Sequence, residues 1–191
     1  MSCMTRWAPD AASRLHEAAL DLFLEQGFAA TTVPQIAERA GLTTRSFFRY
    51  YADKREVLFV GEDELPAVVA RVVDEADPAL APMAVIHSGL RSVVLPRLEL
   101  YRSELLRRWT IVRTDEALRE RELRKLAIID DGATAAFARR GLAPLEAEVA
   151  GRLAVAVYDM TLEWWLAGGG TGSLADILAE VVEVVSATAR P

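Results

Sequence analysis

One short segment of the sequence gathers most of the residues whose types and spacing could do chemistry. It runs TTRSFFRYY, from Thr43 to Tyr51, and combines hydroxyl, guanidinium and aromatic side chains. On a helix, Thr44, Arg45, Phe48 and Arg49 share one face. A guanidinium can hydrogen-bond guanine bidentately, and hydroxyl groups can bond bases or phosphate. The segment therefore predicts a nucleic-acid-binding helix, in which Arg45 is the candidate base reader and Thr44 or Ser46 contacts bases or phosphate.

The charge around this segment is basic although the whole chain is acidic. The chain has a net charge of −6, whereas Leu42 to Arg55 holds four basic residues and one acid, Asp53. Salt confines such a local field to about 10 Å, so the acidic remainder does not exclude a DNA-binding patch. On charge alone, a solvated face of an ordinary helical bundle is the stronger interpretation. The ordered motif around the segment reverses that preference.

The elements that must position this helix are indicated by capping and turn residues. Thr32 with Gln35 forms a capping-box pattern at the start of a preceding short helix, and Gly41 ends it. Ala37 lies four residues before the glycine, and a small residue there lets two helices cross closely. Thr43 caps the second helix, and we expect Leu42, Phe47 and Tyr51 to be core. Two short helices joined by a glycine turn predict a helix-turn-helix, whose second helix enters the major groove.

An amphipathic helix precedes this pair. From about Asp10 to Gln26, the apolar residues follow i, i+3, i+4, i+7 and i+8 spacing, and Gly27 ends the helix. The stripe comprises Leu15, Ala18, Ala19, Leu22 and Phe23.

The segment TTVPQIAERAGLTTRSFFRYYADKREVLF resembles the DNA-binding signature of TetR-family transcriptional repressors. The resemblance extends back through AALDLFLEQGF and covers about residues 10 to 59, whereas the remainder resembles the family only in helix number and length. It implies DNA contacts from Thr32, Thr44, Arg45, Ser46, Phe48, Tyr50 and Lys54, to which the helix face and cap add Thr43 and Arg49. Phe48 stands where the family usually has tyrosine, and Arg45 where a small residue is common, so we expect a missing phenol-phosphate bond and a distinctive operator.

Helical periodicity continues through the rest of the chain and predicts an all-α fold. We expect a helix-turn-helix DNA-binding domain of three helices at residues 1–53, and a larger helical ligand-binding and dimerisation domain at residues 54–191. The expected helices of the second domain cover residues 53–75, with a kink at Pro66, then 81–94, 97–113, 115–140, 144–167 and 173–189.

Several aromatic residues and a histidine of the second domain are candidates for a ligand pocket, because such pockets are mostly apolar with a few polar groups. The candidates are His87, Tyr101, Trp109, Phe137 and Tyr158. The alternative is that these side chains are ordinary core. No second histidine lies three or four residues from His87, so we expect no metal site, and no cofactor is indicated.

The last two long helices have wide apolar faces that need a cover. The faces include Val149, Leu153, Val157 and Met160 in one helix and Ile177, Leu178, Val181, Val182 and Val185 in the other. Pairing with the same helices of a second copy predicts a four-helix homodimer interface. The alternative is that both faces pack within their own chain.

Composition bounds the remaining interpretations. With 191 residues and 52% hydrophobic content the chain can bury a core, and no uncharged run reaches the roughly 18 residues of a membrane span. A single cysteine, Cys3, indicates a reducing cytoplasm. Ser88 follows His87 directly and no acid is placed to orient that histidine, so no catalytic set is indicated. We therefore expect no enzyme and no membrane association.

Together with the TetR-family resemblance, these features predict a cytoplasmic, nucleoid-associated homodimeric repressor. The resemblance implies that it binds a palindromic double-stranded DNA operator and is released by a small molecule, which the apolar candidates suggest is hydrophobic. Two alternatives remain, namely a helical small-molecule carrier without specific DNA binding and a small enzyme that uses the same cavity.

Overall fold

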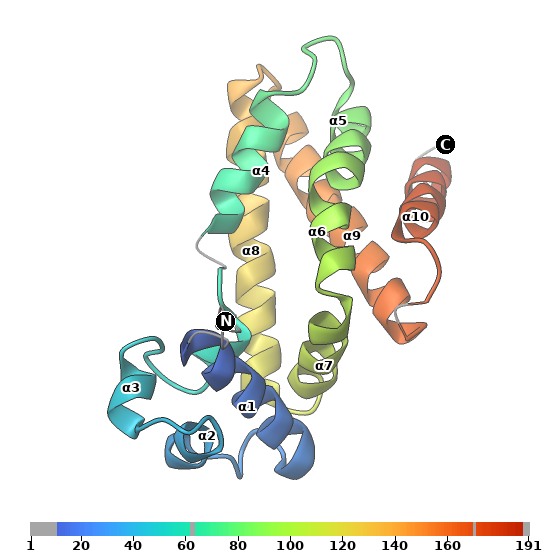
Figure 1. The fold of residues 1–191 in the computed structure, drawn as a ribbon. Helices are drawn as coiled ribbons and strands as arrows, with labels where there is room; N and C mark the ends of the chain where they lie inside the picture. The colour runs from blue at the N-terminus through green and yellow to red at the C-terminus, as the bar shows by residue number, and fades with distance from the viewer. Residues whose placement is uncertain (1–10, 62–63, 170, 189–191) are drawn as a thin grey trace, which may run out of the picture. The chain divides into compact units, whose positions relative to one another are not determined.

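The computed structural model describes residues 11–61, 64–169 and 171–188, and the regular elements within these residues are helices (Figure 1). The expected all-α fold is confirmed. Cys3 and the expected start of the first helix at Asp10 lie outside the described residues. Within them, no helix is both long enough and apolar enough to cross a bilayer.

The chain divides into two compact units. The first comprises Met1–Val60 and Arg107–Arg119, and the second comprises Gly61–Leu106 and Glu120–Pro191. Compactness and independent folding are different properties, so the domain boundary between residues 53 and 54 stays a prediction.

The first unit contains three helices and a short 3-10 turn, joined by a distant segment. These are α1 (Ala11–Gln26), α2 (Val33–Arg39), α3 (Thr44–Phe48) and η1 (Glu56–Leu58), with the end of α7 (Arg102–Val112) and the start of α8 (Glu116–Arg139). Its core includes the whole stripe expected on the first helix. Phe47 is fully buried and Tyr51 is buried, as expected, and Leu42 packs against this core.

The second unit is a helical bundle. It contains α4 (Leu65–Asp74), α5 (Pro82–Gly89), η3 (Leu90–Val94), α6 (Leu95–Leu100), α9 (Pro144–Ala167) and α10 (Leu174–Thr188), with the remaining parts of α7 and α8. α10 lies beside α9 (Figure 1). Glycines permit two close crossings, because a Cβ at Gly89 would overlap Val72 of α4 and one at Gly151 would overlap Thr134 of α8.

Two expectations about prolines were wrong, namely the kink at Pro66 and the break around Pro96 between the helices expected over residues 81–94 and 97–113. The helix expected over residues 53–75 is not continuous, because η1 and α4 are separate elements, and Pro66 lies in the first turn of α4 rather than at a kink. A first-turn proline costs little, since the amide it lacks would have no intrahelical partner. Pro96 lies in the first turn of α6, which follows directly on the π-helical segment η3, and Leu95 N–H donates to Leu90 C=O. The wider π turn accommodates the proline ring, which would crowd a carbonyl in a continuous α-helix.

Tyr101 separates α6 from α7, so the helix expected over residues 97–113 is divided. The three expected helices that follow agree with α8, α9 and α10 to within two residues.

Candidate functional site

The turn between α2 and α3 is a Schellman motif. Gly41 has φ 65°, its N–H donates to Glu38 C=O at 2.9 Å, and Leu42 N–H donates to Ala37 C=O at 2.8 Å. These bonds satisfy the last carbonyls of α2 and require the left-handed conformation that glycine adopts without strain. Arg14 of α1 also donates to the carbonyls of Ala40 and Gly41, which fixes the turn against α1.

Both helices of the pair begin at the expected caps. Thr32 and Gln35 form a complete capping box, in which Thr32 N–H donates to Gln35 Oε1 at 2.8 Å. Thr43 Oγ1 accepts from Ser46 N–H at 3.1 Å, and the two hydroxyl oxygens lie 3.0 Å apart. The caps define where α2 and α3 start, and hence which side chains lie on the first turn of α3.

The outer face of α3 presents the side chains expected to bind DNA. Arg45 and Arg49 are exposed, and Phe48 is 56% exposed although its neighbour Phe47 is fully buried. Arg49 donates to Tyr50 Oη at 2.6 Å and lies over its ring. Arg45 has no hydrogen-bond or ion-pair partner within the described part of the chain, so its guanidinium remains available to a ligand. Thr44 and Ser46 are half-buried on the same short helix.

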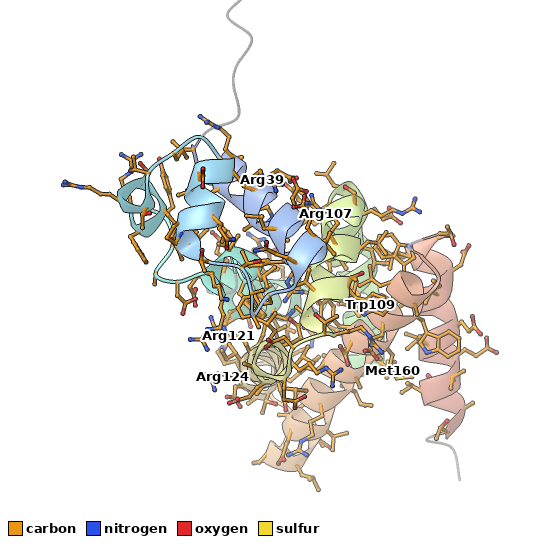
Figure 2. All side chains as sticks on the ribbon, turned by 90° about the horizontal axis from the view of Figure 1, so that it is seen from below. Arg39, Arg107, Trp109, Arg121, Arg124 and Met160 are labelled. Atoms are coloured by element: carbon orange, nitrogen blue, oxygen red, sulfur yellow. The ribbon has the colours of Figure 1, made fainter. Side chains whose placement is uncertain are left out.

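Ion pairs neutralise several acids of α1 within the same unit. Arg39 of α2 binds Glu25 through two bonds of 2.9 and 2.7 Å, and the hydrogen bond from Arg39 lowers the pKa of Glu25. Arg107 binds Glu17 at 2.7 Å and Asp21 at 2.5 Å (Figure 2). These acids therefore offset little of the positive charge of α3.

Residues beyond α6 also hold η1 in this unit. Arg108 donates through Nε to Leu58 C=O at 2.6 Å and lies over the Phe59 ring. The segment Arg107–Arg119 is thus joined to the η1 segment by these contacts and to α1 by the ion pairs of Arg107.

The ammonium group of Lys54 is hydrogen-bonded to backbone carbonyls of its own chain. It donates to Phe28 C=O at 2.6 Å, Thr31 C=O at 2.7 Å and Ala29 C=O at 3.3 Å, and it lies over the Phe28 ring. Burial lowers its pKa. Lys54 therefore holds the loop that precedes Thr32, a role that sequence reasoning missed, whereas direct contact with DNA stays a prediction.

Thr31 is a second residue that sequence reasoning missed. It is 1% exposed, and its hydroxyl donates to Gly27 C=O at 2.8 Å. It stabilises the loop ahead of the capping box. Its neighbour Thr32 carried the recognisable capping pattern, and no separate signal marked Thr31.

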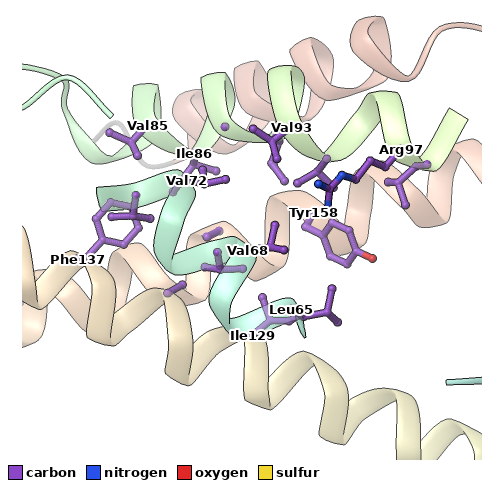
Figure 3. Close-up of a pocket in the computed structure, with 18 residues that line it drawn as sticks. Leu65, Val68, Val72, Val85, Ile86, Val93, Arg97, Ile129, Phe137 and Tyr158 are labelled. Carbon is purple, nitrogen blue, oxygen red and sulfur yellow. The ribbon is translucent and has the colours of Figure 1, made fainter. Parts of the chain in front are cut away.

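The second unit contains an apolar cavity of about 220 Å³. Its lining comes from α4, α5, η3, α6, α8 and α9. Phe137 and Val85 lie at one end of the labelled lining and Arg97 and Tyr158 at the other (Figure 3). Sixteen of the eighteen lining residues present only hydrocarbon. Such a lining suits an apolar ligand body.

Two of the five residues expected to bind a ligand line this cavity, namely Phe137 and Tyr158. Three do not. His87 lies on α5, whose residues Val85, Ile86 and Gly89 are the ones that face the cavity.

The other two ligand candidates, Tyr101 and Trp109, lie outside the cavity lining. Tyr101 is 55% exposed at the break between α6 and α7, and Trp109 belongs to the first unit, where Arg113 lies over its ring. Sequence reasoning missed Arg97 and the α4 residues Val68, Val69 and Val72. The helical spacing of apolar residues in LPAVVARVV was the signal for the latter.

No cluster of three or more His, Cys, Asp or Glu residues able to hold a metal ion occurs among the described residues.

Large apolar side chains are exposed along α9. Leu145, Val149, Met160 and Trp164 are 72%, 48%, 38% and 70% exposed, and Val184 of α10 is 51% exposed. By contrast, Val157, Leu178 and Val181, which the sequence placed on the same interface, are buried within the chain. The exposed apolar set is therefore only partly the expected one.

Known proteins resemble the two parts of the chain to different extents. Residues 15–59 match the family model described as bacterial regulatory proteins, tetR family. A segment of 76 residues is 33% identical to the HTH-type transcriptional regulator TcmR of Streptomyces glaucescens, and it spans 40% of this chain but only 34% of TcmR.

Solved structures extend the likeness of fold to nearly the whole chain. The SmeT–triclosan complex has a TM-score of 0.63 at 19% identity, covering 93% of this chain and 90% of SmeT. FadR of Thermus thermophilus, a TetR-family repressor in complex with lauroyl-CoA, has a TM-score of 0.55 at 22% identity, covering 91% of this chain and 92% of FadR. The capped helix-turn-helix and the family match over it lead to one conclusion: residues 15–59 form a helix-turn-helix DNA-binding region similar to that of the bacterial regulatory proteins of the TetR family, and the fold of nearly the whole chain is similar to those of SmeT and FadR.

Proposed function

We propose that this protein is a ligand-responsive repressor that binds a palindromic operator as a homodimer in the cytoplasm, at the nucleoid. The outward face of α3 is the observation that carries the proposal, because it presents Arg45 without a partner among the described residues beside Arg49, Phe48 and Tyr50. An arginine on such a helix can bond the O6 and N7 atoms of guanine in the major groove. Thr32, Thr43, Thr44 and Ser46 contribute hydroxyl groups that suit phosphate or base contacts.

The homodimer forms through α9 and α10. The exposed apolar residues of α9, with Trp164 the largest, support this part of the proposal. Aromatic anchors dominate the energetics of many interfaces, and a two-fold axis matches a palindromic operator.

A small hydrophobic molecule in the α4–α9 cavity acts as the effector. The hydrocarbon lining supports this, and the complexes of SmeT with triclosan and of FadR with lauroyl-CoA show hydrophobic ligands bound to proteins of similar fold. To weaken DNA binding about a hundredfold, the effector must favour the released state by roughly 2.7 kcal/mol.

Two helices supply the route by which the cavity influences DNA binding. α7 and α8 each contribute residues to both compact units, and α7 directly follows α6, which lines the cavity. Near its middle α7 carries Arg107 and Arg108, which bind α1 and the η1 segment. A shift of α7 therefore acts on its contacts with α1 and η1, which belong to the same compact unit as the helix-turn-helix.

Titration of the purified protein with labelled fragments from upstream of its own gene and its neighbours tests the proposal. We expect one or more fragments to bind far more tightly than a scrambled control and to be released by a hydrophobic compound. Uniformly weak binding to every fragment, with hydrophobic compounds still bound, would instead identify the chain as a helical carrier, which the cavity alone would equally serve.

A further inference from the structure

We infer that the effector carries an anionic group at one end of a hydrocarbon body, and that Arg97 binds this group. The inference rests on the proposed function in one respect, namely that the cavity is the effector site. It adds the chemical class of the effector and the residue that selects it.

The lining separates hydrocarbon from charge. Of the eighteen lining residues only Arg97 and Tyr158 bring polar side-chain groups, and Figure 3 shows both at the same end, with the Arg97 side chain pointing toward Tyr158. Phe137, Val85 and Ile86 lie toward the opposite end (Figure 3). An effector that fills the cavity therefore meets hydrocarbon along its body, and Arg97 and Tyr158 lie at one end of it.

No acidic side chain of the cavity lining neutralises the positive charge of Arg97. No carboxylate lines the cavity, and Arg97 has neither an ion-pair nor a hydrogen-bond partner for its guanidinium in the described ranges. The contrast with Arg140 of the same unit is clear, because that guanidinium donates to the carbonyls of Val73, Ala76, Asp77 and Leu80. Arg140 has a structural role, whereas Arg97 is exposed beside a cavity with its donors available.

The chemistry of the guanidinium then selects the ligand. Its planar N–H groups match carboxylate and phosphate oxygens bidentately, and such charge-assisted bonds are about twice as strong as neutral ones. A neutral polar end can form only the weaker kind of bond there. Hydrocarbon walls that lead to one arginine thus favour an amphipathic anion over a neutral compound of equal length.

Two kinds of molecule share this chemistry. One is a free fatty acid, whose carboxylate is the terminal anion. The other is an acyl-coenzyme A thioester, whose phosphate groups are separated from the neutral thioester by the pantetheine arm. Both combine an unsubstituted hydrocarbon chain with negative charge beyond one end of it, and they differ in how far the charge lies from the chain.

Calorimetric titration of the full-length protein in the absence of DNA, with decanoate, decanoyl-CoA and decanol, tests the inference. We expect at least one of the two anions to bind about ten- to a hundredfold more tightly than decanol, as a charged hydrogen-bond pair predicts. Arg97→Gln should remove this preference and leave the decanol affinity unchanged, and Arg97→Lys should retain part of it. Arg91→Gln, an exposed arginine that does not line the cavity, is the matched control and should behave as the unmodified protein.

The tighter of the two anions identifies the source of the charge. Equal affinity for decanol and both anions, a preference that survives Arg97→Gln, or no binding of any of the three would overturn the inference. Failure of the proposed function is distinguishable from these results. If an anion binds in an Arg97-dependent manner but never releases DNA, the regulatory proposal fails and the assignment of Arg97 stands.

Discussion

The two compact units of this protein use their polar groups in different ways. In the first, caps, a Schellman turn and ion pairs fix nearly every boundary of the helix-turn-helix, and Lys54 is engaged by three carbonyls. In the second, hydrocarbon packing encloses a cavity whose polar side-chain groups lie at one end. Directional bonds hold a recognition helix in one orientation, whereas apolar packing around a cavity leaves room for a ligand to change the balance between states.

The largest change in the free energy of unfolding should come from a substitution in the core of the first unit. Phe47→Ala removes a fully buried ring from α3 and should lower the free energy of unfolding by about 3–5 kcal/mol. Phe48→Ala, which removes the adjacent ring at 56% exposure, is the matched control and should change it by less than about 1 kcal/mol. Urea denaturation measures both variants. Similar losses for the two would show that α3 does not pack as described.

A pair of glycine substitutions should act in opposite directions in the two units. Gly41→Ala forces a Cβ into a residue at φ 65° and should destabilise the protein by about 1 kcal/mol or more. Gly132→Ala adds a Cβ within α8 that meets Pro66 at ordinary contact distance, and it should stabilise by about 0.5–1 kcal/mol. Thermal denaturation of both variants shows whether each substitution raises or lowers stability. Stabilisation by Gly41→Ala would contradict the turn geometry.

Enlarging a cavity-lining residue should lower the affinity for the ligand and change the free energy of unfolding only slightly. Ala154→Val adds two methyl groups at the cavity wall, and we expect a stability change of no more than about 1 kcal/mol, with the apolar gain offset by the lower helix propensity of valine. The affinity for the tighter-binding of decanoate and decanoyl-CoA should fall at the same time. Ala138→Val, at an exposed position of α8, should cost only the propensity difference and leave ligand affinity intact. An unchanged affinity for Ala154→Val would move the ligand site elsewhere.

The smallest effect concerns one carboxylate of α9. Burial raises the pKa of Asp159, and the nearby acids Glu163 and Glu122 raise it further. Because the folded state holds this proton more tightly than the unfolded state, stability falls as pH rises from the ordinary value of 3.8 through the raised pKa. Asp159→Asn should therefore stabilise the protein at pH 7 by less than about 1 kcal/mol and give no gain from charge removal at pH 3. Denaturation curves at both pH values check this, and an equal gain at the two would exclude ionisation as the cause.

The same contrast explains how much could be predicted from the sequence. Caps, the turn glycine and the apolar stripe of α1 are local patterns with local causes, and all were predicted. Lys54 illustrates the limit, since its carbonyl partners at residues 28–31 depend on how distant segments meet.

The second unit was less predictable for the same reason. Phe137 and Tyr158 line the cavity but Trp109 belongs to the other unit, because lining depends on which helix faces converge rather than on aromatic character. The π turn before Pro96 was also missed, since a proline can begin, kink or end a helix according to its surroundings.

The central claim is that α3 reads DNA sequence through Arg45. Fluorescence anisotropy with the tightest upstream fragment, and with versions of it altered one base pair at a time, tests this claim most directly. Arg45→Ala should weaken binding to the tightest fragment by about 1–3 kcal/mol and should abolish discrimination at one base-pair position, whereas Arg152→Ala, an exposed arginine of α9, should preserve that discrimination. Equal losses on every fragment for Arg45→Ala, or no loss at all, would contradict the account.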